Sequence, residues 1–126
     1  MTNVLEFLEN NHSSNYLIDM NRKITYDELL INSKKIGTYL GKIIRKNSPV
    51  PIYMEKGTKT LEVFMGSIYA GGFWTLLNVS LPDNRIKQIM EVLDTDYIVT
   101  DYDNFDKIKS IFEDKQIILY DDMIKE

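Results

Sequence analysis

Residues 50–77, VPIYMEKGTKTLEVFMGSIYAGGFWTLL, carry the pattern that decides the fold. The runs 50–54 and 73–77 are short and mainly apolar, which is typical of buried strands. The residues between them have apolar side chains at helical spacing, so the unit is a strand, a helix and a second strand. Pro51 has no backbone N–H to donate, and this predicts that the first strand lies at a sheet edge or begins there.

The helix between these strands has a predicted start and stop. Thr58 can accept a hydrogen bond from the first turn and cap the helix. Gly71 or Gly72 is expected to end it in the left-handed conformation, which glycine adopts without a steric penalty. The stretch 63–82 is uncharged over twenty positions, but its apolar period changes at the glycine pair, so helix then strand fits better than a membrane span.

A third helix is predicted after the second strand. Pro82 is expected in its first turn, with Ser80 as the cap and Asp83 as the residue that returns the hydrogen bond. The apolar residues that follow are spaced i, i+3, i+4 and i+7, as on one buried helix face. They are Ile86, Ile89, Met90 and Leu93.

The alternation continues toward the C-terminal end. The apolar runs 97–100 and 117–120 predict a third and a fourth strand. Between them, Asp103 is expected to cap a fourth helix. Its inward positions are Phe105, Ile108, Ile111 and Phe112.

Upstream of the decisive stretch, the pattern is that of a small hairpin and a helix. Residues 16–19 and 23–26 flank a polar turn at Asn21, which predicts two short antiparallel strands. Before them, a short first helix is indicated by Val4, Leu5 and Leu8.

The helix after the hairpin has the clearest start signal in the chain. Thr25 and Glu28 have the spacing of a capping box, and Ile24 and Leu29 that of a hydrophobic staple. The apolar stripe of this helix consists of Leu29, Ile36, Leu40 and Ile43.

This helix is expected to run to Lys46, with Asn47 and Pro49 as its stop. Lys42 and Arg45 then fall with Lys46 in the last turns, where the helix dipole favours cations. We interpret this basic cluster as a solvated helix end and not as a nucleic-acid patch.

Strands that alternate with helices over short loops predict right-handed crossovers. The expected fold class is therefore α/β, with a mostly parallel sheet, helices on both faces and a small β-hairpin before it. Residues 1–126 are expected to form one α/β unit, in which 1–48 hold the first helix, hairpin and capped helix, and 49–126 the alternating segment.

Composition excludes several classes of function. The chain has 126 residues, with 15 Lys and Arg against 19 Asp and Glu, a net charge of −4 and a pI near 5.0. This balance argues against a nucleic-acid partner. Because there is no Cys and a single residue, His12, is a histidine, thiolate chemistry and a multi-histidine metal site are excluded. The acidic N-terminus is not a secretory signal, so a cytoplasmic location without a membrane partner is expected.

The sequence contains none of the usual catalytic or phosphate-binding motifs. Gly71-Gly72 follows a helix instead of opening one, so it does not predict a phosphate loop. His12 stands in a polar stretch without a nucleophile elbow, and Trp74 in a predicted strand is interpreted as core. Several carboxylates offer acid–base pairs, but strand ends and helix caps explain them better. They are Asp94, Asp96, Asp101, Asp103 and Asp106, whereas Asp121 and Asp122 lack a positioned partner.

The order of the segments resembles the start of adenylate-forming enzymes. Residues 24–29, ITYDEL, are similar to the family's segment of Leu or Ile, Thr, Tyr, any residue, Glu and Leu. Residues 70–74, AGGFW, are similar to the start of Ala-Gly-x-Ala-Tyr-x-Pro-x-Asp, and 80–86, SLPDNRI, to the helix start Pro-x-x-Arg that follows it. The resemblance covers nearly the whole chain and is strongest for nonribosomal peptide synthetase adenylation domains and D-alanine–carrier protein ligases.

The resemblance implies ATP- and Mg-dependent activation of a carboxylic acid, with an amino acid as the favoured class, followed by transfer to a carrier thiol. The family's phosphate loop and catalytic lysine come after the region seen here, so this segment is expected to be inactive alone and to hold no catalytic, cofactor or metal residue. The remainder of a ligase chain and a carrier protein are the implied partners. Leu76 and Asn78 stand where the family has Pro and Asp, which puts a loop contact in doubt.

Two other hypotheses remain open. The chain can be a stand-alone, non-catalytic α/β domain that binds a partner or self-associates through its apolar faces. A response-regulator-like or flavodoxin-like domain is less favoured, because no acidic cluster at the strand ends and no phosphate loop is evident.

Overall fold

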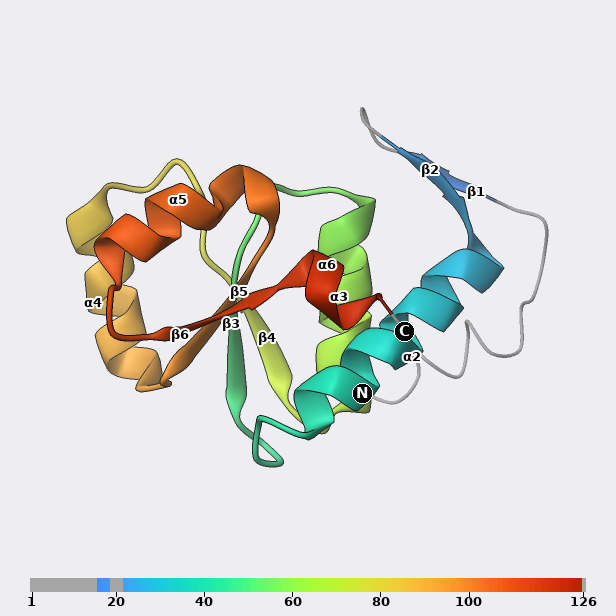
Figure 1. The fold of residues 1–126 in the computed structure, drawn as a ribbon, viewed down its shortest axis with the longest axis horizontal. Coiled ribbons are helices and arrows are strands. Elements are labelled where there is room, and N and C mark those ends of the chain that lie inside the picture. Colours follow the sequence, from blue (N-terminus) through green and yellow to red (C-terminus); the bar gives the residue numbers. More distant parts are fainter. Residues whose placement is uncertain (1–15, 19–21, 126) are drawn as a thin grey trace.

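The computed structural model describes residues 16–18 and 22–125 (Figure 1). The predicted helix with Val4, Leu5 and Leu8 lies outside these residues, as does His12.

The centre of the structure is a parallel sheet of four strands. These are β3 (Pro49–Tyr53), β4 (Phe73–Leu76), β5 (Tyr97–Thr100) and β6 (Gln116–Leu119). They lie in the order β4-β3-β5-β6, and every neighbouring pair is parallel. The predicted strands are confirmed to within one residue at each end.

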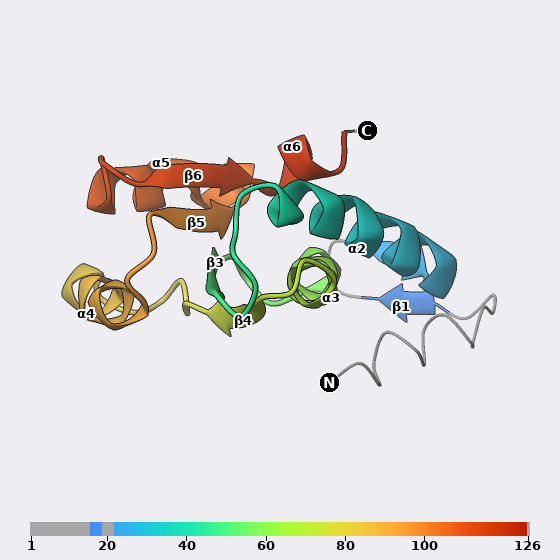
Figure 2. The ribbon, with the colours of Figure 1, turned by 90° about the horizontal axis from the view of Figure 1, so that it is seen from below.

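Helices cover both faces of this sheet (Figures 1 and 2). On one side lie α2 (Tyr26–Gly41), α3 (Thr58–Tyr69) and the short α6 (Tyr120–Met123). On the other side lie α4 (Asp83–Leu93) and α5 (Tyr102–Ile111). The predicted α/β class with helices on both faces is therefore confirmed.

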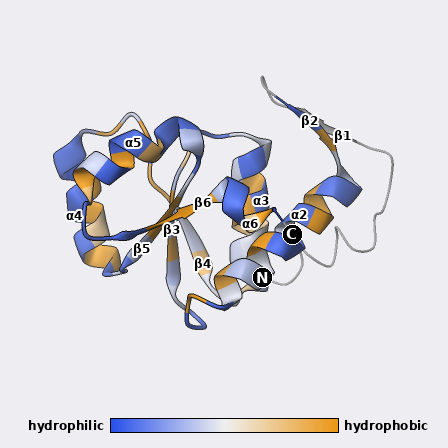
Figure 3. Ribbon diagram, in the orientation of Figure 1, coloured by the Kyte–Doolittle hydropathy of each residue, from blue (hydrophilic) through white to orange (hydrophobic). Residues whose placement is uncertain are grey.

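Each face has its own apolar cluster, because neighbouring residues of a strand point to opposite sides. Ile52 and Val99 pack with α2 and α3, whereas Tyr53 and Ile98 pack with α4 and α5. On the α2 and α3 side the cluster includes Ile36, Leu40, Val50, Val63, Ile118 and Met123. On the α4 and α5 side it includes Leu77, Ile86, Met90, Ile108 and Phe112. Hydropathy follows this division, with apolar stripes on the helices turned toward the sheet (Figure 3).

The hairpin and the start of α2 agree with the sequence pattern. Strands β1 (Tyr16–Ile18) and β2 (Lys23–Thr25) pair antiparallel. The Glu28 N–H donates to Thr25 Oγ1 over 3.0 Å, and the Thr25 N–H donates to Glu28 Oε1 over 2.9 Å, which completes the capping box. Ile24 and Leu29 share one apolar cluster, as the staple requires.

The end of α2 differs from the prediction. The helix ends at Gly41 and not at Lys46, and no basic residue lies in its last turn. The chain leaves the helix early because the following turn buries Ile44 against the sheet. It then reverses at Asn47, which has a φ of 63° and donates its N–H to the Gly71 carbonyl over 2.6 Å. Lys42 is therefore the C-cap of α2, and Arg45 and Lys46 lie beyond the helix and not in its last turns.

Two predicted caps are wrong. Thr58 is the first residue of α3 and Gly57 is its N-cap, so Thr58 Oγ1 instead accepts a hydrogen bond from Arg22 over 3.1 Å. Pro82 is the N-cap of α4, with no side-chain cap. Ser80 lies too far upstream to cap this helix.

The cap of α5 is Asp101 and not Asp103. Because α5 begins directly after β5, the first carboxylate past the strand is at the cap position. Asp101 Oδ1 accepts from the Asn104 N–H over 3.1 Å, and Asp103 lies in the first turn.

Pro51 lies in a central strand, so the predicted edge or starting position for this strand is wrong. The Leu77 N–H donates to the Ile52 carbonyl, which shows that even-numbered residues of β3 turn their backbone groups to β4. Pro51 therefore faces β5, where the pairing begins only at Ile52 and Val99. A missing N–H is tolerated there because the ladder does not reach it.

Strand β4 lies at one edge of the sheet, and its first two side chains are not core. Phe73 is 50% exposed and Trp74 is 43% exposed, although Trp74 was predicted to be buried. The Trp74 ring stacks on Phe64 of α3, with 3.9 Å between ring centroids. The turn before β4 is as predicted, because Gly71 has a φ of 87° and ends α3.

Candidate functional site

The order of the strands places a switch point between β3 and β5. After β3 the chain turns by way of α3 to β4 on one side, and then crosses by way of α4 to β5 on the other side. In open parallel sheets, ligands bind in the crevice that forms beyond the carboxyl ends of such a pair of strands. This end of β3 and β5 is therefore the candidate site.

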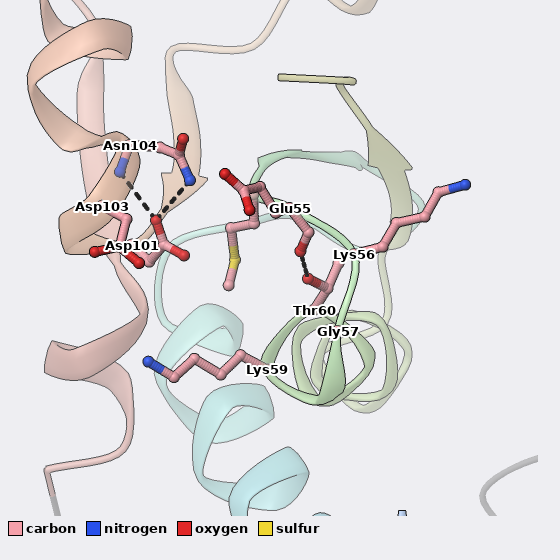
Figure 4. A pocket seen from close by; sticks show the side chains of 9 residues that line it. Glu55, Lys56, Gly57, Lys59, Thr60, Asp101, Asp103 and Asn104 are labelled. Carbon is pink, nitrogen blue, oxygen red and sulfur yellow. Dashed lines mark hydrogen bonds between the residues drawn. The ribbon is translucent and has the colours of Figure 1, made fainter. Parts of the chain in front are cut away.

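A crevice is present at this place. It is lined after β3 and along the start of α3 by Met54, Glu55, Lys56, Gly57, Lys59 and Thr60, and after β5 by Asp101, Asp103 and Asn104 (Figure 4). In Figure 4 the Lys56 side chain extends away from the two aspartates.

Hydrogen bonds fix some of the polar groups that line the crevice. Asp101 Oδ1 accepts from Asn104 Nδ2 over 2.9 Å, in addition to the backbone N–H of the same residue. Thr60 Oγ1 donates to the Glu55 carbonyl. Beneath the crevice, Thr100 Oγ1 donates to the Tyr53 carbonyl over 2.6 Å, which fixes the two strand ends side by side.

This geometry limits what the crevice can hold. Its volume of about 80 Å³ is well below the 300 Å³ or more of ordinary small-molecule sites. Across residues 16–18 and 22–125, no three His, Cys, Asp or Glu side chains are gathered so that they could hold a metal ion. By itself the crevice can admit water beside its acidic residues, Glu55, Asp101 and Asp103, but not a nucleotide.

A second polar cluster is buried between α2, α3 and α6. Glu62 of α3 is 0% exposed, and its Oε2 is 2.8 Å from Nη2 of Arg22. Asn32 Nδ2 of α2 donates to the same oxygen over 3.1 Å, and the Tyr120 hydroxyl of α6 donates to Oε1. One carboxylate thus joins the hairpin turn and three helices.

Burial and the contacts within this cluster shift the pKa values of two of its members, Tyr120 and Arg22. Burial is the main reason why the pKa of Tyr120 is raised far above its ordinary value, and the hydrogen bond to Glu62 adds to it. Partial burial would lower the pKa of Arg22, but the attraction and hydrogen bond to Glu62 outweigh it, so that this pKa is raised. Both shifts keep the neutral phenol and the guanidinium cation in place around the carboxylate.

The raised pKa of Tyr120 predicts alkaline sensitivity. Above about pH 10 the unfolded chain loses this proton while the folded chain keeps it, so the free energy of unfolding falls as the pH rises. In Tyr120→Phe we expect this slope to be smaller by up to about 1.4 kcal/mol per pH unit. Urea unfolding at several alkaline pH values measures it.

Tyr102→Phe is the control for this slope, because Tyr102 is 60% exposed. Tyr97 remains in both variants, and burial raises its pKa too, so some alkaline loss persists. An unchanged slope in Tyr120→Phe contradicts the prediction.

The structure places most of the aspartates that were considered for acid–base chemistry in separate parts of the fold. Asp101 and Asp103 meet in the crevice, whereas Asp94 follows α4 and Asp121 and Asp122 lie in α6. The Gly71-Gly72 pair closes α3 at the opposite end from its N-terminus. Arg22 and Glu62 were not predicted. The available signal was that Glu62 is the one charged residue between Lys59 and Asp83.

Asn78 keeps a loop contact at the position where the resembling family has Asp. Its Oδ1 accepts from the Ser80 N–H over 2.9 Å and from Ser80 Oγ over 2.7 Å. We expect Asn78→Ala to lower the free energy of unfolding by about 1 kcal/mol, because an exposed turn loses both bonds. Asn78→Asp keeps the acceptor and is expected to stay within about 0.5 kcal/mol of wild type by urea unfolding. Equal losses in the two variants contradict this role of the oxygen.

The sequence of residues 6–126 matches the AMP-binding enzyme family, and the chain belongs to it. It is 29% identical over 99 residues to nonribosomal peptide synthetase apmB of Penicillium brevicompactum, covering 78% of this chain and 4% of that protein. It is 28% identical over 106 residues to surfactin synthase subunit 1 of Bacillus subtilis, covering 83% of this chain and 3% of that protein.

Solved structures share the fold. The nonribosomal peptide synthetase FmoA3 bound to alpha-methyl-L-serine-AMP gives a TM-score of 0.84 at 20% identity, over 95% of this chain and 14% of that chain. The o-succinylbenzoate CoA synthetase MenE of Bacillus subtilis with its acyl-adenylate gives a TM-score of 0.80 at 21% identity. This match covers 98% of this chain and 33% of that chain. The chain therefore spans a small part of the length of its relatives. None of the helices in the described residues has the length and apolar character needed to cross a membrane.

Proposed function

We propose that this chain is the N-terminal segment of an ATP-dependent ligase that activates a carboxylic acid as an acyl-adenylate and passes it to a carrier thiol. An amino acid is the proposed acid, with nonribosomal peptide synthetases and D-alanine–carrier protein ligases as the nearest types. The remainder of the ligase chain and a carrier protein are its proposed partners, and the cytoplasm its location.

The observation that carries this proposal is the family match over residues 6–126. The relatives named for nonribosomal peptide synthesis support an amino acid as substrate. ATP and Mg would be held mainly by parts of a ligase outside these 126 residues, because the candidate crevice of about 80 Å³ is too small for a nucleotide.

We also propose that the segment alone does not catalyse adenylation. Its sequence has no Ser/Thr/Gly-rich loop that ends in Lys, and Asp101 in its crevice is engaged in capping α5. ATP–pyrophosphate exchange with a panel of amino acids is expected to stay at background for residues 1–126. An extension along the reading frame that adds such a loop and the later segments is expected to exchange. Turnover by the short chain contradicts the inactivity, and a frame without such a loop contradicts the parent function.

A second candidate function is a non-catalytic domain that self-associates, and the edge strand favours it. Within the part of the chain that the structure describes, no strand pairs with the outer edge of β4, and Phe73 and Trp74 are half-exposed beside it. Free edges with apolar side chains are templates for pairing with another chain. Sedimentation is expected to show a concentration-dependent dimer that Phe73→Lys abolishes. A monomer at all concentrations contradicts this candidate.

A further inference from the structure

The charges of the chain are segregated along its sequence and in space. Residues 22–82 carry nine Lys and Arg against four Asp and Glu, whereas residues 83–126 carry six against twelve. The first group forms α2 and α3, and most of the second forms α4 and α5 on the opposite face of the sheet (Figure 1). The short α6, which also belongs to the second group, lies on the α2 and α3 side and adds Asp121 and Asp122 there. A chain with a net charge of −4 thus presents one basic side.

A groove lies on this basic side, between α2 and α6. Its volume is about 300 Å³, and it is lined by Lys34, Lys35, Thr38, Tyr39, Lys42 and Met123. We call it the α2 groove. Figure 2 shows α6 lying over α2 at this place.

The α2 groove combines three cations with an apolar floor. Lys34 of α2 and Lys42, the C-cap residue just after the helix, are exposed, and Lys35 is half-buried. Met123 is buried against the core, and the Tyr39 ring packs beside it. The acidic residues of α2 lie in its first turn. The short α6 carries Asp121 and Asp122, and Asp122 is paired with Lys125 over 3.7 Å.

We propose that the α2 groove docks an acidic polypeptide segment of a partner protein. Carboxylates of such a segment would meet the three lysines, and its apolar side chains would cover Tyr39 and Met123. A helix with an acidic face and an apolar edge fits a groove that runs along another helix. The acidic side of this chain, formed by α4 and α5, repels the phosphate backbone of a nucleic acid and disfavours that partner.

The test uses the 126-residue chain and a short fluorescein-labelled peptide with glutamate on one helix face and leucine along its edge. Anisotropy at low ionic strength is expected to show binding that weakens as salt is added. Lys34→Glu, Lys35→Glu and Lys42→Glu together are expected to weaken binding about tenfold or more, since three ion pairs become repulsive contacts.

The matched control is Lys87→Glu, Lys107→Glu and Lys109→Glu, which changes the net charge equally on the α4 and α5 side. It is expected to bind more weakly by about twofold at most, the effect of net charge alone. Circular dichroism checks that both variants fold, and the amide resonances that shift on binding are expected to be those of α2. Equal weakening in the two variants, no binding by wild type, or preferred binding of a labelled oligonucleotide overturns the proposal.

Discussion

Glu62→Ala is expected to lower the free energy of unfolding by about 3 kcal/mol, measured by urea denaturation. The carboxylate is buried and accepts hydrogen bonds from Arg22, Asn32 and Tyr120. Removing one partner of a buried ion pair costs about 3–5 kcal/mol, because the other charge remains without compensation. We take the lower figure, since the Arg22 side chain is 23% exposed and water can reach it.

A control variant and a double-mutant cycle test whether the loss of stability comes from the contacts of Glu62. Glu91→Ala removes an exposed carboxylate from α4 and is expected to change stability by less than about 0.5 kcal/mol. A double-mutant cycle of Glu62→Ala with Arg22→Met is expected to give a coupling energy of about 1–2 kcal/mol. A loss below about 0.5 kcal/mol in Glu62→Ala contradicts the central role of this carboxylate.

The same experiment tests whether residues 1–48 and 49–126 form one unit, as proposed from the sequence. Arg22 and Asn32 belong to the first part, and Glu62 and Tyr120 to the second. This cluster supports a single cooperative transition that shifts to lower urea in Glu62→Ala without a second step. Two separate transitions in wild type contradict the proposal.

The alternation of strands and helices could be predicted from the sequence because it depends on local periodicity. The i, i+3, i+4, i+7 pattern of α4 and the capping box of Thr25 and Glu28 each lie within one helix. A cap could not be predicted where two carboxylates compete for it. Asp101 and Asp103 can both cap a helix, and only the direct passage from β5 into α5 decides between them.

What could not be predicted depends on the order of the strands. That order makes β4 an edge, which is why Trp74 is exposed. The same order makes β3 central, where Pro51 is tolerated because the pairing with β5 begins only at Ile52. It also brings the ends of β3 and β5 together to form the candidate crevice. The contact between Arg22 and Glu62 spans forty positions, and no local pattern indicates it.

The close packing of α2 on α3 gives the second large prediction. A Cβ atom at Gly66 would lie 2.4 Å from Ile36 Cγ2, 2.7 Å from Ile36 Cβ and 3.1 Å from the Ser33 carbonyl oxygen. Ile36 is fully buried against the sheet, so it cannot move aside without disturbing the core. The two helices are therefore held at a distance that only glycine allows at this position.

Gly66→Ala is expected to lower the free energy of unfolding by about 2 kcal/mol in urea, and to lower the melting temperature. Overpacking of a filled core costs about 1–3 kcal/mol or more, and this exceeds the gain of about 1 kcal/mol that alanine brings to a helix interior. Gly41→Ala is the matched control, because it changes the last residue of α2 and a Cβ there meets no atom within 4 Å. We expect it to be neutral or to stabilise by up to about 1 kcal/mol. If Gly66→Ala stabilises the chain as Gly41→Ala does, the helices are free to separate and their tight contact does not limit the fold.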